Sequence, residues 1–358
     1  MEKDIKKDPF EKYIKETEPQ KRDKSYAWYT AIGLQAVDGL KTSEYLQNTA
    51  KKNIEGEISV EEAQRLIENY YSCEANKDVT NRTEEADMVA ARIAVLLSEN
   101  AFVFSPTQYI SIHEKLFRGI YAHAGKIRDY NITKAEWVLD GDTVHYGGAS
   151  ELRVTLDYDL DVKKQFSYSG LTLQETIEHL ARFVANLWQI HVFGEGNTRT
   201  TAVFFIKYLR TLGFDVTNDI FAENAWYFRN ALVRANYNNL QNGVNATYEY
   251  LENFLRNLLL GENNELKNRY MHIRYVLESP KCNFQSANCT LDCTLDCTLD
   301  ELRVIEALRK NSKITQKELA KNIGKSERTV KSITIALSEK NYIERVGGKR
   351  FGEWKVLI

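Results

Sequence analysis

The chain contains few residues that interrupt or cross-link secondary structure. Only four of its 358 residues are proline, so long helices can form without interruption. The five cysteines are an odd number, and three of them lie in the iterated "CTLDCTLDCTLD" at 289–300, unlike the framework of a secreted disulfide-rich protein. A zinc site at this repeat is disfavoured because no fourth ligand has suitable spacing. We therefore expect reduced thiols.

Long hydrophobic runs are also missing. No stretch of about 18 consecutive apolar residues occurs, as a membrane-spanning helix would need. The first residues, "MEKDIKKDPFEKY", are charged and do not resemble a signal peptide. We therefore expect no membrane association and a cytoplasmic location. Hydrophobic residues nevertheless make up 43% of the chain, enough for a sizeable globular core.

Charge is unevenly distributed along the chain. The net charge is only −2, but residues 301–358 contain fourteen Lys and Arg against seven Asp and Glu, so this segment carries +7 and the remainder −9. Together with the low-complexity repeat, this asymmetry predicts three parts. They are a domain over 1–275, a linker over 276–300 that contains the repeat, and a basic domain over 301–358.

The pattern of apolar residues predicts a mainly helical protein. Helical spacing recurs over 59–71, 83–100, 105–125 and 171–190, and the stretch "TRTTAVFFIKYLRTLGF" after it is apolar on most faces, as in a central buried helix. Ser59, with Glu61 and Glu62 close behind it, is typical of a helix start. Residues 127–150 differ, because β-branched and aromatic residues surround Asp140 and Gly141. This pattern predicts a small β-hairpin.

The last segment resembles a winged helix domain. In "ITQKELAKNIGKSERTVKSITIALSEKNYI", Gly324 falls at the turn of a helix-turn-helix and Ser326 caps the second helix, while two strand-like runs around Gly347 and Gly348 would form the wing. The recognition helix would present Lys325, Arg328, Lys331 and Thr334. DNA is therefore an expected partner of this domain, and a protein contact is the alternative.

Chemically active residues are concentrated in "HVFGEGNTRT" at 191–200, between two predicted helices. A glycine-rich turn that leads into a helix offers free N–H groups and a partial positive charge to a phosphate. Arg199, in the first helical turn, is electrostatically unfavourable unless an anion is bound. Glu195 would repel phosphate directly and is suited to Mg²⁺ instead, and His191 could accept a proton from a hydroxyl. Residues of the turn are Gly194, Gly196, Asn197 and Thr198.

Each of these residues also has a structural interpretation. A histidine on an apolar helix is more often a packing residue, a Gly-x-Gly-Asn turn is often only a connection between helices, and Arg199 could pair with a neighbouring carboxylate. The combined spacing favours function. His191-x-Phe193-x-Glu195-Gly196-Asn197-x-Arg199 resembles the signature of the Fic family, H-P-F-x-[DE]-G-N-G-R-x-x-R.

The resemblance to the Fic family extends over roughly residues 30 to 260. Upstream, "IHEKLFRGIYAHAGKIRDYN" resembles the family's helix that ends in a Gly-Lys-x-Arg turn. Fic proteins are helical domains that mostly transfer AMP from ATP to a hydroxyl side chain of a target protein with Mg²⁺. The resemblance therefore implies a protein adenylyltransferase that uses ATP and Mg²⁺ and modifies a Ser, Thr or Tyr hydroxyl of a partner protein.

Site roles follow from the resemblance position by position. His191 would be the general base, Phe193 the anchor of the loop, and Glu195 the ligand of Mg²⁺ between the α- and β-phosphates. The anion hole would come from Gly196, Asn197 and Thr198 in the turn that Gly194 opens, and Arg199 would steady the phosphate chain. In this assignment, residues of a single loop carry out proton transfer, metal binding and anion binding.

Two further segments resemble parts of the family's site. The predicted hairpin would be the flap that pairs with an extended segment of the target, and a purely structural hairpin is the alternative. The residues that match the core of the flap are Val138, Leu139, Asp140 and Gly141. "YFRNALVRAN" resembles the helix over the adenine, which places Phe228, Arg229 and Asn236 near the base, with core packing as the competing interpretation.

The sequence departs from the family pattern at several positions. Val192 replaces the usual Pro, and Thr198 replaces a Gly, which narrows the cradle but adds a hydroxyl donor. Ala202 replaces the final Arg, which in the family contacts the γ-phosphate, so the grip on that phosphate is in doubt. Glu55, followed by Gly56, resembles the acid of the family's inhibitory helix, although Lys51 replaces its Ser or Thr. We hypothesise that Glu55 approaches the nucleotide site.

Two other functions fit the same sequence. One is a nucleotide-sensing, DNA-binding regulator with weak or no catalysis. The other is a Fic-type transferase that uses a different donor, such as UTP or CDP-choline, or that catalyses the reverse reaction. Self-association is common among Fic relatives, but the sequence does not locate an interface.

Overall fold

The computed structural model describes residues 19–76, 82–214, 216, 219–278, 304–305, 307–309, 311–323, 325–339, 342–347 and 353–357. The chain separates into two compact units, Met1–Ile273 and Arg274–Ile358. The repeat at 289–300, Gly324 and Gly348 lie outside the described residues. Within them, no helix is long and apolar enough to cross a membrane.

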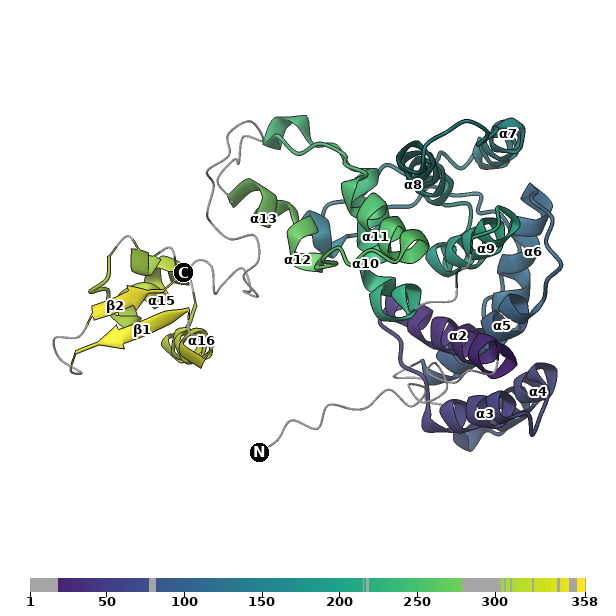
Figure 1. The fold of residues 1–358 in the computed structure, drawn as a ribbon, viewed down its shortest axis with the longest axis horizontal. Coiled ribbons are helices and arrows are strands. Elements are labelled where there is room, and N and C mark those ends of the chain that lie inside the picture. The colour runs from purple at the N-terminus through teal and green to yellow at the C-terminus, as the bar shows by residue number, and fades with distance from the viewer. Residues whose placement is uncertain are drawn as a thin grey trace. The chain divides into compact units, whose positions relative to one another are not determined.

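The first unit is built of helices (Figure 1). The chain begins with α2 (Pro19–Gly33), η1 (Leu34–Asp38), α3 (Glu44–Glu55), α4 (Val60–Tyr71) and η2 (Glu74–Asn76). It continues with α5 (Thr83–Ser98), α6 (Pro106–Phe117), η3 (Trp137–Leu139), α7 (Leu152–Gln165), α8 (Leu173–Ile190) and α9 (Asn197–Thr211). It ends with α10 (Ile220–Ala235), η4 (Leu240–Asn242), α11 (Glu249–Leu260) and α12 (Asn268–Met271), and the boundary with the second unit falls at the start of α13 (Ile273–Glu278).

The central helix of this unit is α9, as the sequence predicts. All residues from Asn197 to Leu209 are buried, and α9 packs against α5, α6 and α8. Such a helix has no polar face to present to water, which is why its sequence shows little amphipathic pattern. The loop at 191–196 therefore leads directly into the centre of the core.

Helix starts follow the expected capping chemistry. The Ser59 hydroxyl accepts a hydrogen bond from the Glu62 N–H at the start of α4, which confirms the predicted helix start. At the start of α8, Thr172 and Glu175 form a reciprocal capping box. These bonds satisfy N–H groups that lack partners within their helix. These bonds fix the residue at which α8 begins. They therefore also help to fix the position of His191, which follows the other end of this helix.

The predicted β-hairpin at 137–148 is wrong. Residues Trp137–Leu139 form a 3₁₀ turn instead, and the loop is closed by bonds from the Glu136 N–H to the Asp142 oxygen (2.9 Å) and from the Gly141 N–H to the Glu136 oxygen (3.0 Å). The physical reason is burial: Val138 and Leu139 are adjacent, and both are buried. A strand would turn consecutive side chains to opposite faces.

A lysine is buried where α7 packs on α8. Lys163 is 5% exposed, its ammonium lies 4.4 Å from the centre of the Tyr168 ring and 4.9 Å from that of Phe183, and its Nζ is 2.8 Å from Nδ1 of His179. Burial lowers the pKa of Lys163 to about 7, although the rings stabilise the charged form. The lysine therefore takes a proton less readily in the folded protein than in the unfolded chain.

This shift predicts a pH dependence of stability. Because the unfolded chain binds more protons than the folded protein between about pH 7 and the ordinary lysine pKa of 10.5, stability should rise with pH across that window, by at most about 1.4 kcal/mol per pH unit. We expect Lys163→Met to remove this rise in urea unfolding at several pH values. Lys164→Met, at the exposed neighbouring position, is the matched control. An unchanged pH profile in Lys163→Met would contradict the assignment.

The second unit has its own small core. It contains α15 (Gln316–Ile323), α16 (Glu327–Glu339) and an antiparallel pair, β1 (Ile343–Val346) and β2 (Glu353–Val356), in which Ile343 pairs with Val356. Ser326 accepts a hydrogen bond from the Thr329 N–H and so caps α16, as predicted. The core includes Leu319, Val330, Leu337, Ile343 and Trp354. The predicted winged helix is confirmed.

Candidate active site

The loop between α8 and α9 is closed by its own asparagine. The Asn197 Oδ1 accepts a hydrogen bond from the Phe193 N–H (3.0 Å), and the Asn197 Nδ2 donates to the Phe193 oxygen (2.7 Å). His191 at φ 52° and Gly196 at φ 75° turn the chain at the two ends of the loop. Asn197 is 2% exposed, so its side chain serves the loop and is not turned outward toward a ligand.

Two residues of the upstream segment hold the loop from outside. The Arg128 Nε donates to the His191 oxygen (2.8 Å), and the Arg128 N–H donates to the Val192 oxygen (2.9 Å). His113 lies 3.0 Å through Nε2 from the Glu195 oxygen, and its Nδ1 accepts from the Gly125 N–H (2.9 Å). Since Nδ1 accepts, Nε2 carries the proton and donates to the carbonyl.

His113 also supports the loop by stacking. Its ring lies 3.7 Å from that of Phe193 at an angle of 9°, and burial lowers the pKa of His113 to about 3, which keeps it neutral. His113 is not among the site residues that the sequence predicts. Its only signal was a polar residue among the apolar positions of "YISIHEKLF", since the partner, Glu195, lies 82 positions further along the chain.

His191 lies beneath Tyr146. It is 4% exposed, its Nδ1 is 3.3 Å from the Trp188 oxygen, and its ring centre lies 4.2 Å from that of Tyr146. The Nε2 atom is buried and has no hydrogen-bond partner. Burial lowers the pKa of His191 well below its usual 6.5. With the proton on Nδ1, this neutral imidazole has a free lone pair on Nε2, which is the form of a general base.

Glu195 is an exposed residue of the loop between α8 and α9. Its side chain is 53% exposed, and one carboxylate oxygen lies 3.2 Å from the Lys134 ammonium. Among the described residues, no group of three His, Cys, Asp or Glu could hold a metal ion. Mg²⁺ commonly binds through one or two carboxylates and the phosphates of its substrate, so a single exposed Glu195 fits Mg²⁺ that arrives with a nucleotide.

Arg199 does not have the expected position. It is fully buried, and its guanidinium pairs with Glu85 (2.7 Å) and Asp38 (2.8 Å) and donates to Gln35 (3.0 Å). These acids compensate the cation that is otherwise unfavourable at the start of a helix. Arg199 therefore fastens α9 to α5 and η1, and the prediction that it contacts the phosphate chain is wrong for this conformation.

The residues of the glycine-rich turn at 194–198 are tightly packed. A side chain at Gly194 would come within 2.5 Å of the Tyr130 hydroxyl, and one at Gly196 within 2.4 Å of the Phe117 ring. The hydroxyl of Thr198 accepts from the Trp188 indole (3.0 Å) and Thr198 is buried, so its side chain points into the core rather than into the turn. The loop has the expected position before a helix, but Tyr130 covers Gly194.

The predicted adenine residues have structural partners. Phe228 is buried in the core against Phe221 and Phe254, which corrects its assignment to the nucleotide. Asn236 donates to the Ala185 and Leu232 oxygens, both at 3.0 Å, and so joins α10 to α8.

Arg229 is the predicted adenine residue that connects to the flap segment. Its guanidinium forms a two-point pair with Glu136 (2.6 and 3.1 Å). The same carboxylate accepts from the Tyr146 hydroxyl (3.0 Å). Among the predicted flap residues, Asp140 at φ 58° and Gly141 at φ 90° make the turn that follows η3. Arg229, Glu136 and Tyr146 thus form a continuous chain of contacts from α10 to His191.

Glu55 lies far from this site. It pairs with Lys21 in the first turn of α2 (3.5 Å), whereas Arg199 contacts Gln35 just beyond the other end of α2. Fourteen helical residues span about 21 Å. The hypothesis that Glu55 approaches the nucleotide loop is therefore wrong for this structure.

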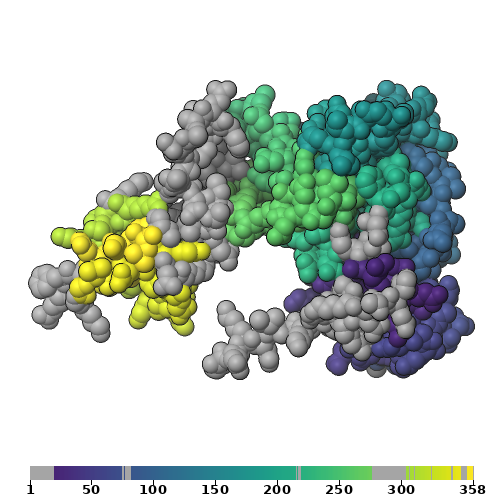
Figure 2. Space-filling model, in the orientation of Figure 1, coloured from purple at the N-terminus to yellow at the C-terminus, as the bar shows by residue number. Residues whose placement is uncertain are grey.

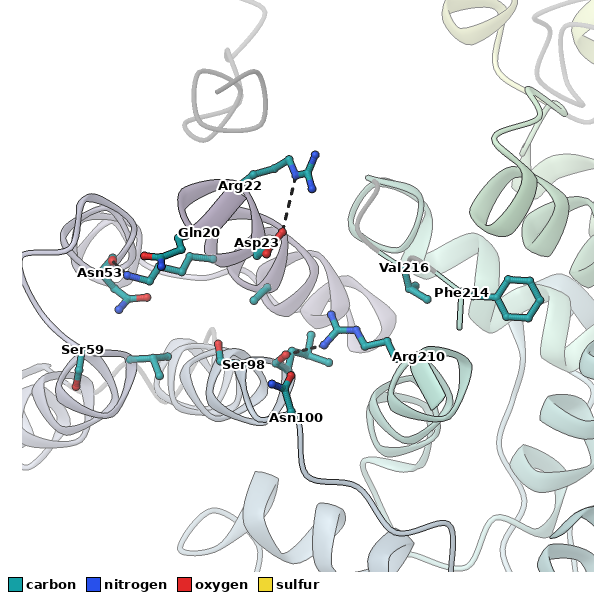
Figure 3. A pocket seen from close by; sticks show the side chains of 14 residues that line it. Gln20, Arg22, Asp23, Asn53, Ser59, Ser98, Asn100, Arg210, Phe214 and Val216 are labelled. Atoms are coloured by element: carbon teal, nitrogen blue, oxygen red, sulfur yellow. Dashed lines mark hydrogen bonds and ion pairs between the residues drawn. The ribbon is translucent and has the colours of Figure 1, made fainter. Parts of the chain in front are cut away.

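A separate cavity of about 690 Å³ lies between Asn53 and Arg210 rather than at the loop (Figure 3). Side chains from α2, α3, the end of α5 and the end of α9 line it, among them Lys24, Asn53, Ser98 and Arg210. Arg210 is eleven residues beyond Arg199 on α9, about 16 Å along the helix. The cavity is therefore not the site that the loop forms.

Two segments of the chain match known families. Residues 103–209, which extend from before α6 to near the end of α9, match the Fic/DOC family, and residues 301–344 match a winged helix-turn-helix DNA-binding domain. No curated protein matches the chain. A solved Fic family protein from Desulfovibrio desulfuricans G20 is 13% identical, with 97% of this chain and 89% of that chain covered at a TM-score of 0.44. The chain therefore contains a Fic/DOC family domain, which includes the loop at 191–196, and a winged helix-turn-helix domain.

Proposed function

We propose that the chain is a Mg²⁺-dependent protein adenylyltransferase, which transfers AMP from ATP to a Ser, Thr or Tyr hydroxyl of a target protein. The observation that carries the proposal is the His191 imidazole, whose buried Nε2 has no hydrogen-bond partner. A buried polar atom without a partner is costly, so its presence calls for an explanation, and a role in a reaction is one such explanation. His191 belongs to the loop that precedes the N-terminus of α9, and the N-terminus of a helix favours the binding of an anion.

The chemistry needs few protein groups. The His191 Nε2 accepts the proton of the target hydroxyl, the hydroxyl oxygen bonds to the α-phosphorus of ATP, and the bond from that phosphorus to pyrophosphate breaks. Glu195 would hold Mg²⁺, which neutralises charge on the phosphates. His113 and Arg128 hold the carbonyls of Glu195 and His191 and so position the loop.

Access to His191 requires a local movement. Tyr146 covers the imidazole, Tyr130 covers Gly194, and Lys134 pairs with Glu195. All three residues lie in the segment 130–146, but Val138, Leu139 and Val144 of this segment are buried in the core, so the movement that uncovers the base, the glycine and the carboxylate is one of the three side chains rather than of the whole segment. Since the Glu195 side chain is exposed, its ion pair with Lys134 adds at most about 1 kcal/mol to the closed conformation.

Two labelled forms of ATP test the proposal. We expect protein in a mixture of candidate targets to retain label from ATP labelled at the α-phosphate and none from ATP labelled at the γ-phosphate, because the γ-phosphate leaves in pyrophosphate. A chelator of Mg²⁺ should abolish the labelling. Label from the γ-position would indicate phosphoryl transfer, and labelling only from UTP or CDP-choline would indicate another donor; either result contradicts the proposal.

A second candidate function is a DNA-binding regulator that senses a nucleotide without transferring it. The favouring observation is the start of α16, where Lys325, Arg328 and Lys331 are all exposed. Thr334, predicted to face DNA with them, is 2% exposed and lies in the core of the unit, so that prediction is wrong. Salt-sensitive, sequence-selective DNA binding by the full chain without any label transfer would favour this function.

A further inference from the structure

The first turns of α9 offer no available cation to a ligand at the loop. Arg199 is completely buried, and Glu85 and Asp38 both pair with it. Ala202, nearly one turn further along the helix, carries no charge and is also completely buried. Protein sites that bind a polyphosphate commonly add a Lys or Arg side chain to the metal ion. A nucleotide at this loop therefore needs a cation from another element.

Two arginines close to His191 are held by other groups of the protein. The Arg128 side chain donates to three backbone carbonyl oxygens, among them that of His191 (2.8 Å). Arg229 forms its two-point pair with Glu136, which is 1% exposed. If Arg229 turned to a phosphate, it would leave a buried carboxylate uncompensated, which is costly. Both arginines therefore serve the structure of the site.

Lys134 differs from these arginines because its partner is exposed. Its ammonium lies 3.2 Å from the Glu195 carboxylate, and the side chains of Lys134 and Glu195 are 26% and 53% exposed. The backbone of Lys134 is fixed, since its N–H donates to the Thr143 hydroxyl (3.1 Å) and Glu136, two residues later, is buried. An exposed ion pair is weak. The ammonium can therefore change its partner without disturbing the core, while the backbone keeps it beside the loop.

The charge of Lys134 acts on two chemically active residues of the loop. One is Glu195, its partner in the ion pair. The other is His191: burial is the main cause of its low pKa, and among the charged groups that lower this pKa further, Lys134 has the largest effect. The ammonium is thus close to the base and to the carboxylate that suits Mg²⁺. A phosphate that Mg²⁺ joins to Glu195 would also lie close to this ammonium.

We propose that Lys134 is the phosphate-binding cation of this site and supplies the charge that α9 does not. In the absence of nucleotide, Lys134 pairs with Glu195. When Glu195 holds Mg²⁺, the metal compensates the carboxylate, and the Lys134 ammonium turns to an oxygen of the nucleotide polyphosphate. A lysine suits this exchange, because its three donors lie at the end of a flexible stem and act as a point charge. The inference rests on the proposed function, since it concerns the same loop and the same nucleotide.

Binding of an ATP analogue that cannot transfer AMP tests the inference. The probe is α,β-methylene-ATP with Mg²⁺, in which a carbon replaces the oxygen between the α- and β-phosphorus. In calorimetric titrations of the full chain, we expect Lys134→Ala to raise the dissociation constant about tenfold, because a charge-assisted contact is lost. Lys134→Arg keeps the charge and should stay within about threefold of the wild type.

A lysine from a similar ion pair is the matched control. Helix α6 forms part of the surface of the first unit, in blue in Figure 2, and Lys115 on this helix lies 3.6 Å from the Glu99 carboxylate. Both of these side chains are exposed. Lys115→Ala removes one positive charge from the same unit and should bind the probe as the wild type does. All the variants should melt near the wild-type temperature, since neither lysine is fully buried.

The outcomes separate this inference from the proposed function. Equal affinities of Lys134→Ala and the wild type, or a wild-type chain that does not bind the probe at about 1 mM, would overturn the inference. A loss in Lys134→Arg as large as in Lys134→Ala would overturn it too, because the effect would then not depend on charge. If the affinity falls as expected but α-labelled ATP labels no protein, the proposed transfer fails and the role of Lys134 in nucleotide binding stands.

Discussion

Replacement of His191 by alanine is expected to lower the transfer of AMP by about 10²- to 10⁴-fold, the usual contribution of a general base. The effect should be large because the pKa of His191 lies well below 6.5, so the imidazole is neutral and its Nε2 lone pair is free throughout the physiological range. Glu195, the nearest acid along the loop, forms an ion pair with Lys134. The measurement is the initial rate of incorporation of α-labelled ATP.

Two further variants make this result interpretable. His191 has a positive φ of 52°, which asparagine tolerates better than alanine, so His191→Asn should keep the loop conformation and still lose activity. His145→Ala is the matched control, because His145 is exposed and the hydrogen bond that it accepts from Gln189 is made by its backbone oxygen. Retention of activity in both His191 variants, with unchanged melting temperatures, would remove His191 from the reaction.

Local chemistry made the helices predictable. The serine and threonine caps of α4 and α8, and the uniformly apolar sequence of α9, express interactions between residues close together in the chain. The hairpin prediction failed at Val138 and Leu139, because the alternating pattern around them did not reveal that both of these adjacent side chains enter the core. Burial of neighbouring residues depends on tertiary contacts, and these override strand propensity.

The candidate site was predictable as a loop but not in its contacts. The sequence placed His191, Glu195 and Asn197 in a turn before a helix, and the structure agrees. It could not orient Arg199 or Thr198, because their partners, Glu85 and Trp188, come from other helices. The contacts of His113 and Arg128 with the loop were not predictable for the same reason, since each residue lies more than sixty positions away from its partner in the chain.

Replacement of Arg199 by methionine is expected to lower the free energy of unfolding by about 3 kcal/mol, because it leaves the buried Glu85 carboxylate without its closest cation on α9. Burial raises the pKa of that carboxyl, but hydrogen bonds from Tyr121 and Arg199 outweigh this effect and keep the pKa below its usual value. Arg82 still pairs with Glu85 at 2.6 Å, so the loss should be at the lower end for a broken buried pair. Urea unfolding measures the change.

A double-mutant cycle separates this anchoring role from phosphate binding. Adding Glu85→Gln to Arg199→Met should recover part of the lost stability, since the uncompensated charge is then removed. Arg118→Met, which breaks an exposed pair with Glu114, is the matched control and should cost under about 0.5 kcal/mol. If Arg199→Met instead keeps wild-type stability and weakens only the binding of ATP, then Arg199 leaves Glu85 and Asp38 when nucleotide binds. Its role would then be the phosphate contact that its place in the helix first indicated.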